Sequence, residues 1–189
     1  MYWFLILLIP GFISNLASAF TTTYSEKWGK KTGTLITVIL RDVTGIPLWA
    51  VGFVAAIRES SNLLYRISLP VQIIGWTVLA AGAVIITIAL ISIRTKAAAP
   101  STGDTLVNKG IYSMVRHPIH CGTFLEFAGI LILWPSLQVG IACAAGVLWI
   151  ILQSRFEEKD LVKRIPEYSD YMKKVPRFFP SLMKKNKGQ

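Results

Sequence analysis

The residues best suited to chemistry lie in two short polar stretches of an otherwise apolar chain. The first runs from Gly110 to Pro118, reads GIYSMVRHP, and lies where a basic loop meets an apolar segment. The second is the pair Glu157 and Glu158, farther along the chain. Arginine, histidine and paired glutamates are costly at a membrane boundary. They therefore predict a polar ligand held against the bilayer.

Most of the remaining chain is typical of a membrane anchor. Of its 189 residues, 53% are hydrophobic and 16% are charged, and its mean hydropathy is +0.53. A soluble domain of this size rarely reaches such values. The net charge of +10 comes from 20 basic and 10 acidic residues, and half of the basic ones lie from Arg155 onward. Because no recognition motif accompanies this charge, it predicts a cytoplasmic, lipid-facing tail rather than nucleic-acid binding.

Five apolar segments predict an all-α, multi-pass membrane helical bundle with about five transmembrane helices, since roughly 20 apolar residues cross the hydrocarbon core. They are residues 1–20, 35–57, 69–93, 119–133 and 137–152. The first is interrupted by Pro10-Gly11 and also resembles a signal peptide, although it lacks a basic start. The last two, divided by Pro135, predict a C-terminal helical hairpin that need not span fully.

Single residues inside these segments add detail. Arg41 and Asp42 in the second segment are expected to face the bundle or a boundary. Small residues in the third segment allow close helix contact: Gly75, Ala80, Ala81, Gly82 and Ala83. Cys121 and Cys143 match no zinc spacing and no disulfide pair, so we expect small buried side chains and no metal site.

The loop charges predict an orientation and a division of the chain. An outside N-terminus puts the first loop, the third loop and the C-terminus in the cytosol, on one side with both polar stretches.

Residues 1–94 then form three N-terminal spans. Residues 95–189 form the catalytic region: motif loop, hairpin and amphipathic tail. The tail's apolar stripe, divided by Pro166 and Pro176, is expected to lie on the membrane or cap the site: Leu161, Val162, Ile165, Tyr168, Tyr171 and Val175.

Four motifs in fixed order carry a family resemblance. TLVNKGIY begins at Thr105 and RHPIHCG begins at Arg116; EEKDL begins at Glu157, and YSDYMKKVP ends at Pro176. Together they resemble the isoprenylcysteine carboxyl methyltransferase family, to which the phospholipid methyltransferases are related. The agreement covers residues 105–180, less than half of the chain.

The resemblance implies S-adenosylmethionine as methyl donor, bound in a cytosolic pocket without a Rossmann sheet. It also implies a lipophilic acceptor that enters from the bilayer, either a small molecule or a prenylated or lipid substrate. The cofactor contacts that it implies are Asp104, Thr105, Leu106, Val107, Tyr112, His117, Pro118, Ile119, His120, Glu157 and Glu158. The candidates for orienting or activating the acceptor are Arg116, His120, Gln153 and Arg155.

The chemistry of these side chains suits such a cofactor. Carboxylates can pair with its ammonium or accept its ribose hydroxyls, and Arg or His can hold its carboxylate. Methyl transfer is an in-line displacement, so alignment and exclusion of water can supply most of the catalysis. A carboxylate acceptor needs no base, whereas an amine or thiol could use His117 or His120. All three acceptor classes therefore remain open.

Two positions depart from the family pattern. His120 stands where the family usually has Tyr, which introduces a titratable ring. Gln153 stands where the eukaryotic carboxyl methyltransferases carry an Arg one helical turn before the glutamate pair. Arg155 is two residues later, and because each residue turns a helix by about 100°, it should point elsewhere.

Two other functions compete with this interpretation. Membrane reductases of the steroid and sterol type have a similar Arg-His-Pro element and bind NADPH, although the EEKDL motif favours the methyltransferase. A non-catalytic membrane scaffold or transporter subunit is the second rival. The compact chain suggests a prokaryotic cell membrane.

Overall fold

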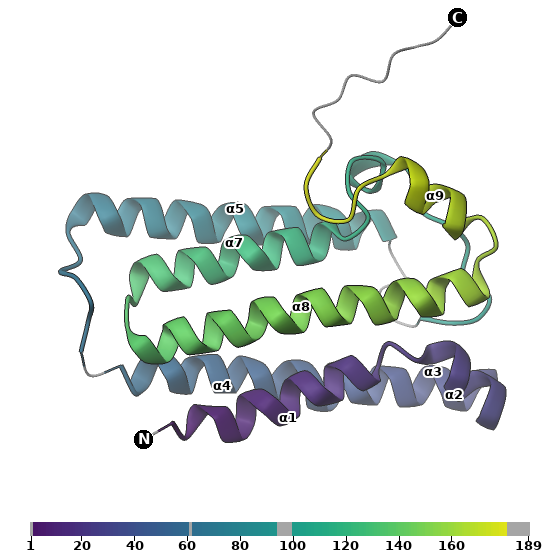
Figure 1. Ribbon diagram of the computed structural model, residues 1–189, viewed down its shortest axis with the longest axis horizontal. Coiled ribbons are helices and arrows are strands. Elements are labelled where there is room, and N and C mark those ends of the chain that lie inside the picture. The colour runs from purple at the N-terminus through teal and green to yellow at the C-terminus, as the bar shows by residue number, and fades with distance from the viewer. Residues whose placement is uncertain (1, 61, 94–99, 181–189) are drawn as a thin grey trace, which may run out of the picture.

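Every regular element in the described residues, 2–60, 62–93 and 100–180, is a helix in the computed structural model. Figure 1 shows the long helices running side by side, with the C-terminal elements gathered at one end. In chain order the elements are α1 (Phe4–Ala17), α2 (Thr21–Trp28), α3 (Lys30–Val38), η1 (Ile39–Gly45), α4 (Ile46–Arg58), α5 (Leu69–Ile93), η2 (Gly110–Ser113), α7 (Pro118–Leu133), α8 (Leu137–Arg164) and α9 (Tyr168–Lys174).

Three helical runs are long and apolar enough to cross a membrane: Lys30–Arg58, Leu69–Ile93 and Leu137–Arg164. The pair α1 and α2 passes the same test but bends by 63°, which allows a fourth, broken span or a re-entrant loop. At 16 residues α7 is shorter than a full span. By length and composition, the described residues therefore contain three or four candidate spans, and the count of about five stays a prediction.

The N-terminal helix differs from the expected pattern. Pro10 lies inside α1, which continues through it to Ala17. The break comes instead between Ala17 and Thr21. A helix tolerates proline where neighbouring helices or side chains compensate the lost backbone bond, and α1 packs closely on α4. Interruption at Pro10-Gly11 was therefore a wrong prediction.

Arg41 and Asp42 lie in η1, a π-helical segment between α3 and α4. The wider turn leaves backbone carbonyls that hydroxyl groups satisfy: Ser14 Oγ donates to the carbonyl of Leu40 at 2.9 Å, and Thr44 Oγ1 donates to it at 3.1 Å. π-helical turns occur frequently at functional sites. Arg41 Nε and Nη2 bond the carboxylate of Asp42 at 2.7 and 2.9 Å.

Glycines bring α5 and α7 into close contact. A Cβ on Gly122 would lie 2.6 Å from the carbonyl oxygen of Gly82, and one on Gly82 would lie 2.6 Å from that of Gly122. A Cβ on Gly129 would approach the carbonyl of Gly75 to 3.0 Å. The predicted small-residue contact is thus correct for Gly75 and Gly82, while the neighbouring alanines 80, 81 and 83 are exposed.

Aromatic side chains fill the centre between α1, α4, α7 and α8. Phe12 stacks on Trp149 at 5.0 Å, and Phe53 stacks on Phe127 at 4.9 Å. Cys143 is buried in this core and Cys121 is half-buried; both are free thiols.

The last helix of the predicted hairpin is much longer than expected. We expected it to end at residue 152, but α8 continues to Arg164 and carries the glutamate pair with it. Ile165 and Pro166 end the helix, and α9 turns back over its end.

The tail's apolar stripe packs mostly against the motif loop: Ile165, Tyr168 and Tyr171 are buried with Leu106, while Val162 is exposed. The tail therefore caps the motif loop.

Candidate functional site

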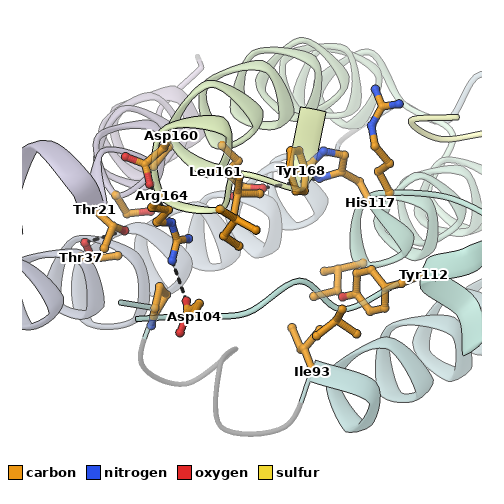
Figure 2. Close-up of a pocket in the computed structure, with 18 of the residues that line it drawn as sticks. Thr21, Thr37, Ile93, Asp104, Tyr112, His117, Asp160, Leu161, Arg164 and Tyr168 are labelled. Carbon is orange, nitrogen blue, oxygen red and sulfur yellow. Dashed lines mark hydrogen bonds and ion pairs between the residues drawn. The ribbon is translucent and has the colours of Figure 1, made fainter. Parts of the chain in front are cut away.

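A cavity of about 730 Å³ lies at the end of the bundle where the motif loop, α8 and α9 meet α2, α3 and η1. Figure 2 shows side chains from these separate elements pointing toward a common space. Its walls are mainly apolar, as in most ligand pockets. Family-motif residues therefore share one cavity with residues from the N-terminal half.

The motif loop is tied to the C-terminal tail. Gly110 has φ +59°, a conformation that favours glycine and starts the short helix η2. Tyr171 Oη donates to the carbonyl of Tyr112 at 2.5 Å. The backbone amides of Arg116 and His117 bond the carbonyls of Pro176 and Arg177 at 2.9 and 3.1 Å. The end of the YSDYMKKVP motif and the residue that follows it therefore position the RHP motif through main-chain contacts.

Glu158 is the buried centre of a charge network. Its side chain is 3% exposed, and its Oε1 accepts from Arg116 Nε at 2.9 Å and lies 3.1 Å from His117 Nε2. Arg177 Nε adds a bond of 3.0 Å to the same oxygen, and Arg177 Nη2 bonds Oε2. Arg116 Nη1 also donates to the carbonyls of Met172 and Val175. These contacts hold three separate segments together.

Glu157 has different surroundings from its neighbour. Its side chain is 34% exposed and lines the cavity. Gln153 Nε2 donates to Glu157 Oε1 at 2.7 Å, and Glu157 Oε2 lies 3.6 Å from His117 Nδ1. Gln153 is buried one turn earlier on α8 and does not line the cavity itself. Its amide thus orients the glutamate that does.

His120 lies one helical turn after His117 and is 8% exposed. Its ring stacks on that of His117, with centroids 5.2 Å apart and planes at 13°. Trp149 and Phe178 approach it edge-on. Among the described residues, its Nδ1 is buried without a hydrogen-bond partner.

A second polar cluster holds the start of the motif loop. Arg164 Nη1 donates to Asp104 Oδ2 and to the carbonyl of Ser101, both at 2.6 Å. Arg164 Nε lies 3.1 Å from Asp160 Oδ2, and Asp160 Oδ1 accepts from the amide of Thr22 at 2.9 Å. Figure 2 shows the bond from Arg164 to Asp104 across the cavity wall. The cluster joins α8, the loop and α2.

Burial and nearby charge shift the titration of groups in the tail. Burial raises the pKa of Tyr171 to about 12, opposed by Arg116 and reinforced by Glu158. Burial, together with Glu157, also raises the pKa of Tyr112 above its usual value. The bond to Glu158 raises the pKa of Arg177. The tyrosines therefore stay neutral, which suits hydrogen bonding and packing.

Most of the residues that the sequence indicates reach the cavity. Those that line it are Asp104, Thr105, Leu106, Val107, Tyr112, Arg116, His117, Ile119, His120 and Glu157. Pro118, Gln153, Arg155 and Glu158 are not among its lining residues. Arg155 is exposed and lies beside a smaller cavity with Phe20 and Phe156, as the helical rotation predicts.

Several lining residues were missed by sequence reasoning. Asp160 and Arg164 carry a signal that could have indicated them, an acid–base pair at i,i+4 on one helix. Thr21 and Thr37 carry none: they are buried polar residues of two different helices, joined at 3.1 Å. Arg41 and Asp42 also line the cavity, so the expectation that they face the bundle or a boundary agrees with their position.

Comparison with known proteins agrees with the motif assignment. The family model described as phospholipid methyltransferase matches residues 70–168. The methanethiol S-methyltransferase of Pseudomonas deceptionensis is 34% identical over 83 residues, covering 41% of this chain and 29% of that protein. The cobalt-zinc-cadmium resistance protein CzcN of Cupriavidus metallidurans is 34% identical over 80 residues, covering 42% of this chain and 37% of that protein.

A second resistance protein is similar to the same extent. The nickel-cobalt-cadmium resistance protein NccN of Alcaligenes xylosoxydans xylosoxydans is 35% identical over 78 residues, covering 41% of this chain and 37% of that protein. In each case the chain matches well under half the length of the curated relative. No solved structure matches the chain.

Proposed function

The chain belongs to the phospholipid methyltransferase family, and on that premise we propose that it transfers a methyl group from S-adenosylmethionine to a lipophilic acceptor at the cytosolic face of the membrane. The observation that carries this proposal is one cavity lined by the motif loop, by Glu157 and by both histidines. Its volume of about 730 Å³ lies within the usual range for sites that enclose a small ligand.

The two ends of the cavity suit different parts of the reactants. The polar end carries the carboxylate of Glu157, which can pair with the cofactor's ammonium or accept its hydroxyls. The run 104–107, anchored through Asp104 to Arg164, can line the cofactor with its backbone. Leu90 and Ile93 of α5 line the cavity at an apolar wall, where a lipophilic acceptor can pack. Tyr168 and Leu161 close the space beneath α9.

Positioning is the main contribution that these residues make to methyl transfer. Bound S-adenosylmethionine supplies the electrophilic methyl group on its sulfonium. Transfer needs the acceptor in line with the breaking bond, with water excluded. The capping tail and the close α5–α7 contact give the walls of such a site. Glu158, Arg116 and Arg177 hold the RHP motif in place through their buried ion pairs.

We propose a thiol as the first acceptor class to test. The methanethiol S-methyltransferase relative carries this chemistry in its name. A thiol must lose its proton before or during transfer, and His117 and His120 line the cavity as candidate bases. Carboxylate and amine acceptors need the same cofactor contacts and form the next groups to screen.

Cofactor binding tests the proposal directly. Calorimetric titration of the detergent-solubilised chain should show saturable binding of S-adenosylhomocysteine and none of NADPH. Glu157→Ala should abolish it, whereas Glu167→Ala, which removes an exposed carboxylate outside the cavity, should not. Binding of NADPH alone would favour a reductase and overturn the proposal. Binding of neither ligand by folded protein would favour the non-catalytic scaffold.

The same preparation then tests the acceptor. Transfer of a labelled methyl group to a small thiol, measured in detergent and in vesicles, is the expected result. Labelling of a carboxylate or amine compound instead would support methyl transfer but reject a thiol as the acceptor.

A further inference from the structure

Three side chains with lone pairs converge beside the RHP motif. One ring nitrogen each of His117 and His120 and one carboxylate oxygen of Glu157 all lie within 4.8 Å of one another. Both histidines are buried, and the glutamate is half-buried at the cavity wall. Imidazole and carboxylate groups are common ligands of divalent transition metals.

The carboxylates around His117 indicate which nitrogen of the neutral ring offers a lone pair. Its Nε2 lies 3.1 Å from Glu158 Oε1, and an ionised carboxylate can only accept. In the neutral ring the proton is therefore on Nε2, and Nδ1 carries the lone pair. That lone pair lies 3.6 Å from Glu157 Oε2. In the neutral ring two electron-rich atoms thus face each other, and either a proton on Nδ1 or a metal ion between them stabilises the pair.

The surroundings of this cluster resemble those of metal ligands. A metal-bound histidine usually donates its other N–H to a carboxylate, which fixes the ring. Glu158 is the carboxylate that His117 faces through Nε2, and Arg116 and Arg177 donate hydrogen bonds to Glu158. Gln153 bonds Glu157 Oε1 at 2.7 Å and leaves Oε2 directed at His117.

His120 supplies a separate observation. In the part of the chain that the structure describes, its buried Nδ1 has no hydrogen-bond partner. A buried polar atom without a partner destabilises the fold, because it has lost its hydrogen bonds to water. Its stacking on His117 and its contacts with Trp149 and Phe178 hold the ring beside the other two ligands. A metal ion bound by this ring would add a favourable interaction in the same place.

We propose that His117, His120 and Glu157 bind one divalent transition-metal ion of the zinc or cobalt type. Ligands at about 2.0–2.2 Å from a tetrahedral zinc lie roughly 3.4 Å apart. The pair His117 Nδ1 and Glu157 Oε2, at 3.6 Å, is already near this value. The widest separation within the cluster is at most 4.8 Å, so it has to close by at most about 1.4 Å. Three protein ligands leave a fourth position for water or a pocket ligand.

The site goes beyond the proposed methyl transfer and is tested without it. The full chain, purified in detergent without a histidine tag and stripped with a chelator, is titrated with Co²⁺. We expect one equivalent to bind, with the visible absorption of a four- or five-coordinate cobalt ion, and Zn²⁺ to displace it. The chain has only two histidines, both in the cluster, so a histidine-dependent spectrum reports on this site.

Paired variants make the test specific. His120→Phe keeps an aromatic ring and should abolish the cobalt spectrum; Glu157→Gln should weaken cobalt binding at least tenfold. Two control variants should leave the spectrum unchanged. Cys121→Ser removes another possible ligand beside the site, and Glu167→Gln removes an exposed carboxylate. Circular dichroism checks that each variant is folded. Absence of stoichiometric binding, or an unchanged spectrum in folded His120→Phe, would overturn the proposal.

S-adenosylhomocysteine titration of the same samples separates this proposal from the previous one. Cobalt binding without S-adenosylhomocysteine binding would retain the metal site and reject the methyltransferase. S-adenosylhomocysteine binding without cobalt binding would do the reverse.

Discussion

Glu157 and Glu158 are adjacent on α8 but have opposite surroundings. Glu158 is 3% exposed and bonded to Arg116 and Arg177, while Glu157 is 34% exposed and faces the cavity. A helix turns about 100° per residue, so adjacent carboxylates point in different directions. One glutamate therefore holds the motif loop in place, and the other is available to a ligand.

Glu158→Gln should destabilise the fold. The change leaves Arg116 and Arg177 without their shared carboxylate, and breaking a buried ion pair typically costs about 3–5 kcal/mol. For a chain of this size, a loss of about 3 kcal/mol lowers the unfolding midpoint by roughly 6–12 °C. Thermal unfolding in detergent measures the shift. Glu167→Gln is the matched control, and an equal midpoint in both variants would contradict the network's structural role.

Gly122→Ala should separate α5 from α7. The new Cβ would lie 2.6 Å from the carbonyl oxygen of Gly82, a backbone atom that cannot rotate away. Overpacking of this kind costs roughly 1–3 kcal/mol. Gly140→Ala is the control, since its Cβ meets nothing within 4 Å and alanine favours a helix. Thermal unfolding should show a lower midpoint for the first variant alone; equal midpoints would argue against a tight glycine contact.

Arg164→Met should weaken cofactor binding. Methionine keeps much of the side-chain length but loses the bonds to Asp104 and to the carbonyl of Ser101, so the start of the motif loop is released. We expect S-adenosylhomocysteine affinity to fall about tenfold, equivalent to roughly 1.4 kcal/mol. Calorimetry measures it, with the exposed neighbour Lys163→Met as control. Equal affinities would show that the loop does not need this anchor.

Tyr171→Phe should make the free energy of unfolding less sensitive to high pH. The folded pKa of Tyr171 is raised by burial to about 12, from an ordinary value of 10.0. Its contribution is therefore complete below pH 10 and is lost as the pH rises through about 12. The free energy of unfolding, measured by denaturation between pH 9 and 12, should fall less steeply with pH in Tyr171→Phe than in the wild-type chain. An identical profile in both proteins would contradict a buried neutral phenol bonded to Tyr112.

Zinc should weaken cofactor binding, because the proposed metal ligands are among the proposed cofactor contacts. A carboxylate that binds a metal ion is less available to the cofactor's ammonium. We expect saturating Zn²⁺ to lower S-adenosylhomocysteine affinity at least tenfold, measured by calorimetry at fixed pH. In His120→Phe the effect of zinc should disappear. An affinity unchanged by zinc in the wild-type chain would place the cofactor's polar head away from Glu157.

The sequence by itself determined the helical class, the bounds of α5 and α7 to within a residue, and the motifs that line the cavity. These features depend on local apolar runs, on proline positions and on short polar motifs, all of which can be found in one stretch of chain. The family assignment came from the same motifs and agrees with the matched family model.

Only the tertiary structure decided which polar residues meet. Continuation of α8 to Arg164 depends on α9 and the motif loop packing on its end, which no local pattern shows. Thr21 and Thr37 reach the cavity because α2 and α3 fold together there, and His117 meets Glu157 across two helices. Such contacts join residues far apart in the sequence, so their geometry follows from how the helices pack rather than from residue spacing.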